Sequence, residues 1–208
     1  MSNPLETRIS LVSFMDFVTA KASQRITVVR SIAEMYAEDY TRGPDFYRDV
    51  REALREGIIR GDDVRRLNEA AASHAGDNRR DSYRAVAAGW EQWRQRKALS
   101  VFATTEKWRE QQLQVNVSPA FIWRQRGGSR LVVPYYKGEE LSTDAAQAAT
   151  RIVELTFGAE HGRAAVLDVR RARLHQARQR RSRDYDAWLS GEVSAFLRML
   201  RSIGRPAA

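Results

Sequence analysis

The sequence has no cysteine, little lysine, little proline and no long apolar run. Without cysteine the chain has no disulfide, no thiolate nucleophile and no Cys-ligated zinc or iron–sulfur site, which suits a reducing compartment. No run approaches the roughly 20 apolar residues that a helix needs to cross a bilayer. Ser13 and Asp16 interrupt the apolar stretch from Ile9 to Val18, and no basic segment precedes it, so we expect no signal peptide. These absences predict a soluble, cytoplasmic protein.

The chain is strongly basic, with a formal net charge of +9, and the excess is unevenly distributed. Residues 1–100 carry 17 basic and 15 acidic side chains, whereas residues 151–208 carry 12 and 6. One stretch, called here the arginine run, has no acidic residue among Arg170, Arg171, Arg173, Arg178, Arg180, Arg181 and Arg183. Because arginine contacts to phosphates give affinity without reading sequence, the run is a candidate nucleic-acid-binding segment. The alternative is a solvated connection in an arginine-rich protein.

The first hundred residues have the periodicity of helices, with apolar residues three and four positions apart. Two of these stripes are Ile26, Val29, Ile32 and Tyr36, and Tyr83, Val86, Trp90 and Trp93. Breaks follow at Gly43-Pro44, at Gly61 and at Gly76, and the helix after Gly76 is predicted to reach about Lys97. The pattern predicts a helical module at residues 1–100.

Residues 101–208 combine strand and helix signals, and we predict a second module there. The expected order is strand (113–117), strand (121–125), strand (131–137), helix (142–158), strand (164–169), strand (173–177) and helix (185–200). Gly127-Gly128 is a hairpin signal, and Pro134, which lacks a ladder donor, predicts an edge position or a bulge for its strand. The expected fold class is α+β, with a helical N-terminal half followed by a small mixed β-sheet flanked by helices.

This order of elements is similar to the core of the PD-(D/E)XK nuclease superfamily, a restriction-endonuclease-like fold. The resemblance is carried by Val117-Ser118-Pro119-Ala120, by the stretch from Val132 to Gly138, and by Gln147 in the following helix. In active members a Pro-Asp step opens the second strand, a hairpin follows, and a hydrophobic strand ends in Asp/Glu-x-Lys. The resemblance covers roughly residues 108–180. It implies a site in which two acidic residues hold Mg²⁺ and a lysine positions or activates the attacking water.

The chain departs from the family pattern at both acidic positions. Ala120 matches the first aspartate, and Tyr135 matches the acid of Asp/Glu-x-Lys, so only Lys137 and Gln147 match as remnant catalytic candidates. Mg²⁺ prefers hard oxygen ligands, usually carboxylates, which neither a methyl group nor a neutral phenol supplies. We therefore expect no metal, no cofactor and no catalytic residues beyond those two remnants.

Other acidic and histidine residues allow a different interpretation. Glu139, Glu140, Asp144 and Asp168 are candidates for a rearranged carboxylate site in a divergent metal-dependent nuclease. The alternative for Asp168 is a structural ion pair with Arg170, two residues on along the same strand face, because a buried charge needs a partner. The three histidines, His74, His161 and His175, lack the four-residue spacing of a helical zinc motif.

The leading interpretation is a non-catalytic protein, nucleic-acid-binding or accessory, on a degenerate nuclease-like fold, with DNA or RNA as its partner. A second interpretation is a protein–protein adaptor, because the last predicted helix has a broad apolar stripe from Tyr185 to Leu200. That stripe would dock a protein partner or a second copy of the chain, or it would pack on the protein's own sheet.

Overall fold

The computed structural model describes residues 7–36, 45–74, 79–177 and 183–204, and it confirms an α+β chain whose helical half spans residues 11–94. The helices of this half are α1 (Leu11–Thr19), the short 3-10 turn η1 (Ala22–Gln24), α2 (Arg25–Met35), α3 (Arg48–Arg60), α4 (Asp63–Ser73) and α5 (Arg80–Arg94). The Ser10 side chain caps α1 by accepting from Ser13 N, and Gly61 ends α3 at a φ of 77°. The predicted breaks at Gly43-Pro44 and at Gly76 lie outside the described residues.

The strands form two sheets, and the prediction of one small sheet was wrong. The five-stranded sheet has the order β2-β5-β6-β7-β8, and the three-stranded sheet has the order β1-β4-β3. The strands are β1 (Thr7–Ser10), β2 (Ala98–Val101), β3 (Glu106–Glu110), β4 (Leu113–Val117), β5 (Phe121–Gln125), β6 (Gly128–Tyr135), β7 (Arg163–Asp168) and β8 (Arg173–Gln176). After β6 and β7 come α6 (Thr143–Phe157) and a second short 3-10 turn, η2 (Val169–Arg171), and α7 (Arg183–Ile203) follows β8.

Short strands account for the error in the number of sheets. β1 and β2 contain four residues each, too few to show alternation, and they gain their hydrogen bonds from distant strands. β1 pairs in parallel with β4, across more than 100 residues, and so draws β4 out of the main sheet. The neighbour of β5 on its other side is β2, which forms from residues just after α5, because α5 ends at Arg94, before the predicted Lys97.

The hairpin of β5 and β6 confirms the signal at Gly127-Gly128. For the strand of Pro134 an edge position or a bulge was predicted, and the edge condition holds only locally, at Pro134 itself. β6 lies between β5 and β7. However, β5 pairs with β6 only as far as Val132, so β6 has β7 as its one neighbour at Pro134. The missing N–H of Pro134 is accommodated because a partner strand is lacking on one side there.

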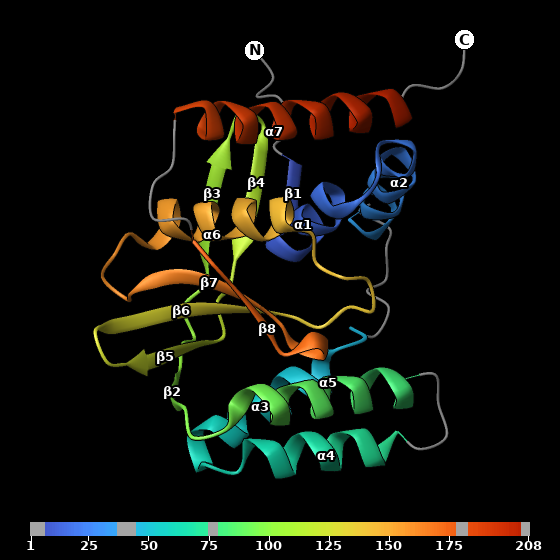
Figure 1. The fold of residues 1–208 in the computed structure, drawn as a ribbon. Coiled ribbons are helices and arrows are strands. Elements are labelled where there is room, and N and C mark those ends of the chain that lie inside the picture. The colour runs from blue at the N-terminus through green and yellow to red at the C-terminus, as the bar shows by residue number, and fades with distance from the viewer. Residues whose placement is uncertain (1–6, 37–44, 75–78, 178–182, 205–208) are drawn as a thin grey trace.

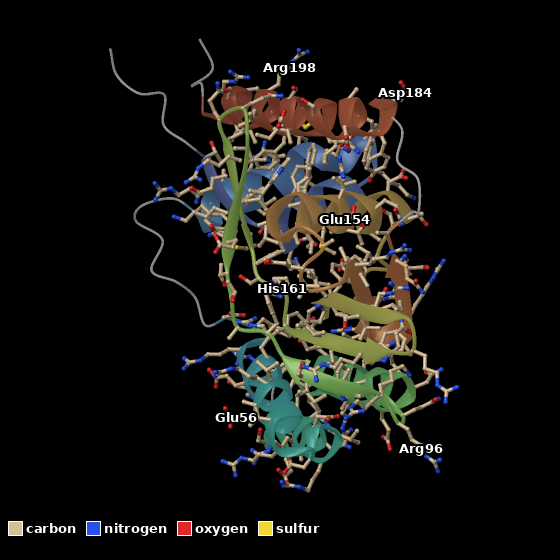
Figure 2. All side chains as sticks on the ribbon, turned by 90° about the vertical axis from the view of Figure 1, so that its left-hand side faces the viewer. Glu56, Arg96, Glu154, His161, Asp184 and Arg198 are labelled. Carbon is tan, nitrogen blue, oxygen red and sulfur yellow. The ribbon has the colours of Figure 1, made fainter. Side chains whose placement is uncertain are left out.

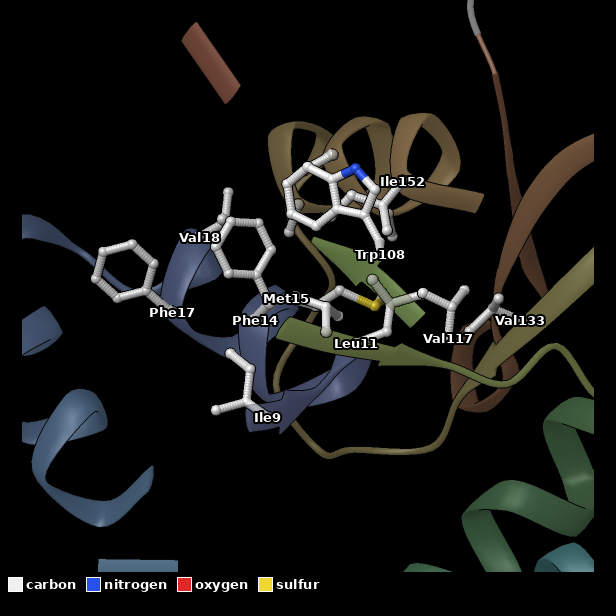
Figure 3. Packing of buried hydrophobic residues seen from close by; sticks show 14 of the residues in the cluster. Ile9, Leu11, Phe14, Met15, Phe17, Val18, Trp108, Val117, Val133 and Ile152 are labelled. Carbon is white, nitrogen blue, oxygen red and sulfur yellow. The ribbon is translucent and has the colours of Figure 1, made fainter. Parts of the chain in front are cut away.

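Two hydrophobic cores cover the two faces of the five-stranded sheet (Figure 1). Alternate residues of β6 point to opposite cores, with Leu131 and Val133 in the first core and Val132 in the second. The first core includes α1, α6, α7 and the three-stranded sheet, and Figure 3 shows Phe14, Met15 and Trp108 packed within it. The second core includes α3, α4 and α5. Burial on both faces explains why β6 and β7 are continuous apolar runs.

The apolar stripe of α7 lies in the first core, where Leu189, Val193, Phe196 and Leu197 are buried. The stripe therefore packs on the protein's own core, the simpler of the two interpretations. The division into modules at residue 100 stays a prediction, and each core contains residues from both sides of that boundary.

Candidate functional site

The five-stranded sheet has two ends, and they differ in their chemistry. β6 and β7 run in parallel and finish at the same end, where Tyr135 pairs with Asp168 and η2 follows. We call this the η2 end and define it by Asp16, Tyr135, Lys137, Asp168 and Arg171. The opposite end contains the turn between β5 and β6, and we call it the hairpin end.

Tyr135 is part of the core at the η2 end. The side chain is 1% exposed, and burial is the largest influence raising its pKa. The carboxylates of Asp16, Glu139 and Asp168 raise the pKa further, and Arg171 opposes them. Tyr135 packs in the first core, whereas Ala120 packs against the second, so the two positions matched to the family's acids lie on opposite faces of the sheet.

Lys137 forms an ion pair with Asp16 of α1, more than 100 residues away in sequence. Burial raises the pKa of the Asp16 carboxyl, and the ammonium group of Lys137 offsets part of that increase. The Asp16 side chain is 18% exposed and that of Lys137 is 38% exposed. The remnant lysine is therefore paired with a carboxylate of α1, a helix of the first core.

Asp168 forms the predicted structural ion pair, but with Arg171 in place of Arg170. Its carboxylate is 0% exposed and accepts from Arg171 Nη1 at 3.2 and 3.3 Å and from Leu141 N at 3.3 Å. The prediction of Arg170 assumed that the strand continued, whereas β7 ends at Asp168 and η2 turns the chain. Arg170 instead donates to the carbonyl of Tyr136 at 2.7 Å and to the hydroxyl of Tyr47 at 2.9 Å.

The other described residues of the arginine run, Arg171 and Arg173, also contact groups of the chain itself. Arg171 Nη2 donates to the carbonyl of Gly138 at 2.5 Å, and Arg173 Nη1 lies 3.0 Å from Glu140 Oε1. Arg170, Arg171 and Arg173 thus fasten the connection between β6 and α6 to the turn after β7. Of the rest of the arginine run, Arg178, Arg180 and Arg181 lie outside the described residues, as does the side chain of Arg183.

Gln147, the second remnant, lies in the first turns of α6, where Ser142 provides the N-cap. Its side chain is buried, and Nε2 donates to the backbone carbonyl of Gln176 at 2.9 Å. This contact fastens α6 to β8, whereas the contact of Lys137 leads to α1. The two remnants therefore have separate structural partners.

Within the described residues, no group of three or more His, Cys, Asp or Glu side chains is arranged to hold a metal ion. His74 Nε2 lies 2.8 Å from Asp49 Oδ2, and its ring packs edge-on against Tyr83. His175 is buried in β8, and burial is the largest influence lowering its pKa, followed by the charge of Arg173. Asp144 lies in the first turn of α6, where a carboxylate favours the positive end of the helix dipole.

The hairpin end gathers basic residues that the sequence interpretation did not select. They are Arg96, Arg124, Arg126, Arg130 and Arg163. They come from the turn after α5, from β5 and its turn, from β6 and from β7, and sheet register alone brings them together. No local signal marks them, because the largest sequence separation among them is 67 residues and acidic or neutral residues intervene.

None of the described helices is long and apolar enough to span a membrane. No protein-family model, no curated protein and no solved structure matches the chain. The resemblance to the PD-(D/E)XK superfamily therefore rests on the residues and the order of elements alone.

Proposed function

We propose that the protein binds nucleic acid without catalysing its cleavage, as a binding or accessory protein on a degenerate nuclease-like core. The hairpin of β5 and β6, followed by α6 and a parallel strand, is the order that suggested this core and supports the analogy. The opposite faces of Ala120 and Tyr135 weigh against an intact site of that kind. Fold analogy alone does not establish function.

The observation that carries the non-catalytic part is the pairing of Lys137 with Asp16 beside the buried Tyr135. Pairing with Asp16 directs one donor of the Lys137 ammonium to a protein carboxylate of α1, and a buried neutral phenol is a poor ligand for Mg²⁺. Two of the four carboxylates of the alternative nuclease site are also engaged, Asp168 by Arg171 and Glu140 by Arg173. This engagement argues against the divergent-nuclease interpretation.

The nucleic-acid part of the proposal is supported by the net charge of +9 and by its concentration in arginine. The adaptor interpretation has less support, because the stripe of α7 is buried in the first core. Among the described residues, the most exposed large apolar side chains are Met35 and Tyr36 at the end of α2, Ile59 of α3 and Leu155 of α6, and small exposed groups of this kind are ordinary.

Binding to short single- and double-stranded DNA and RNA, measured across salt concentrations with and without Mg²⁺, tests the proposal. We expect binding at low ionic strength that weakens steeply with salt, because phosphate contacts release counterions. We also expect intact nucleic acid in both Mg²⁺ conditions. A peptide nucleic acid of the same sequence has no phosphates and serves as the control that should not bind. No binding to any nucleic acid at low salt overturns the proposal, and Mg²⁺-dependent cleavage overturns its non-catalytic part.

A further inference from the structure

The hairpin end joins arginines from four segments in one region of the surface. The register sets Arg124 beside Ala98, directly after Arg96 and Lys97, and sets Arg130 beside both Trp123 and Arg163. Arg126 lies in the turn between β5 and β6. In Figure 1 this turn and the connection from α6 to β7 project from the same side of the molecule. These four segments thus bring basic residues to the same end of the sheet, with Arg124 on the face of the first core and Arg130 and Arg163 on the face of the second, so the basic surface wraps around that end.

The charges of this surface are not neutralised by described residues. Arg96, Arg124, Arg126 and Arg163 are exposed, and none of the four forms an ion pair within the part of the chain that the structure describes. The three described arginines of the arginine run differ, because each donates to a carbonyl, a carboxylate or a hydroxyl of the chain itself. Guanidinium groups without a protein partner are available to a ligand, whereas those that already bind groups of the chain are less available.

Arg130 and Arg163 form the centre of the surface. They are neighbours on parallel strands, and like charges at that position repel each other. Arg130 Nη2 donates to Gln176 Oε1 at 2.9 Å, but its Nε is buried without a hydrogen-bond partner. A buried donor without a partner carries a cost that a bound acceptor removes. An anion between these two guanidinium groups would satisfy the donor and relieve the repulsion.

Packing beneath the arginines holds the surface in place. The Lys97 ammonium lies 5.0 Å from the Trp93 ring centroid and 5.6 Å from that of Trp123, and the two rings meet edge-to-face. The turn itself is built on glycine, with φ values of 86° and 141° at Gly127 and Gly128. Glycine adopts such positive φ values without strain, whereas other residues do so only at a cost. The turn that presents Arg126 therefore has a defined conformation.

We propose that the hairpin end binds the phosphodiester backbone of nucleic acid through Arg96, Arg124, Arg126, Arg130 and Arg163. This inference rests on the proposed function and names the surface that performs it. The guanidinium fork matches phosphate oxygens in pairs. Binding to an anionic membrane usually adds apolar side chains that enter the lipid. Among the described residues, the most exposed large apolar side chains are Met35 and Tyr36 at the end of α2, Ile59 of α3 and Leu155 of α6, outside the segments that carry the five arginines. Nucleic acid is therefore the polyanion that the surface fits better.

The test compares two charge-reversal variants of the full chain. Arg124→Glu with Arg126→Glu changes the hairpin end, and Arg198→Glu with Arg201→Glu makes the same change in net charge on α7. Figure 2 shows Arg198 and Arg96 at opposite ends of the molecule. We expect the hairpin variant to lose at least about tenfold in affinity for a DNA duplex and to have a salt slope smaller by about two. We expect the α7 variant to lose at most about threefold in affinity. It shares only the long-range effect of lower net charge and keeps the contacts of the hairpin end.

Each result identifies which proposal fails. If the wild-type protein binds and both variants lose the same affinity, the surface is wrong while the proposed function stands. If the wild-type protein binds no nucleic acid, the proposed function itself fails. Tighter binding to anionic phosphatidylserine vesicles than to DNA, lost in the hairpin variant, overturns nucleic acid as the partner.

Arg163→Ala separates binding from folding. It removes one of two repelling charges on exposed surface, so we expect a thermal unfolding midpoint no lower than that of the wild type, together with severalfold weaker DNA binding. A lower midpoint together with unchanged DNA binding would show that Arg163 supports the fold and would overturn its role in the surface.

Discussion

The two ends of the five-stranded sheet are both rich in charged residues, but they use the charges differently. At the η2 end, Asp168 is buried, Asp16 is half-buried and Arg171 is more exposed, but each is engaged by another group of the chain. At the hairpin end, four arginines are exposed and unpaired with described residues. Net charge alone does not distinguish these cases. The comparison shows that a cluster of arginines in the sequence predicts binding only where the fold leaves its guanidinium groups free.

The largest effect that we expect at the η2 end follows from Arg171→Ala. This change leaves the carboxylate of Asp168 fully buried with Leu141 N as its one remaining described donor, and breaking such a pair costs about 3 kcal/mol of unfolding free energy. Urea denaturation measures the loss. Arg173→Ala is the matched control, because its pair with Glu140 is more than half exposed and contributes less than about 1 kcal/mol. Equal losses in the two variants would contradict the distinction between a pair with a buried carboxylate and an exposed pair.

The next effect concerns the packing that positions η2. A Cβ at Gly89 of α5 would lie 2.0 Å from Val169 O and 2.8 Å from the carbonyl carbon of Arg170. Gly89→Ala therefore forces α5 away from η2, and such overpacking costs about 2 kcal/mol. Gly191→Ala in α7 is the control, because a Cβ there meets nothing within 4 Å and alanine favours a helix by about 0.5–1 kcal/mol. Thermal unfolding should move the two midpoints in opposite directions, and a stable Gly89→Ala variant would show that α5 does not hold η2.

The smallest effect is a pH dependence that Asp16→Asn removes. Burial raises the pKa of Asp16 above its ordinary value of 3.8, so the folded protein keeps this proton over a pH range in which the unfolded chain has lost it. In that range the folded state binds more protons, and wild-type stability falls as the pH rises from about 4 through the raised pKa. We expect the stability of Asp16→Asn relative to the wild type to increase as the pH rises over the same range.

Chemical denaturation at several pH values between about 4 and 7 measures this difference. Asp186→Asn, at the exposed pair with Arg151, is the control for the loss of a carboxylate. A difference between Asp16→Asn and the wild type that does not change with pH would mean that burial does not govern the ionisation of Asp16.

Local signals in the sequence predicted much of the fold. The stripe of α5, the helix α6, the hairpin at Gly127-Gly128 and strand β7 were all predicted and are present. Each depends on residues within a few positions of one another. The remnants Lys137 and Gln147 were also selected from local pattern, but their partners Asp16 and Gln176 were not predictable, since they lie 121 and 29 residues away.

The sequence by itself determined the α+β class, the absence of cysteine chemistry and the positive charge, because composition and short-range periodicity depend on the chain alone. Tertiary structure decided that β1 pairs with β4 and makes a second sheet, and that Asp168 pairs with Arg171. It also decided that Arg130 and Arg163 lie side by side. The physical reason is that strand register and the end of a strand at a turn depend on pairing between segments far apart in the chain, and this pairing decides which charges are neutralised and which face solvent.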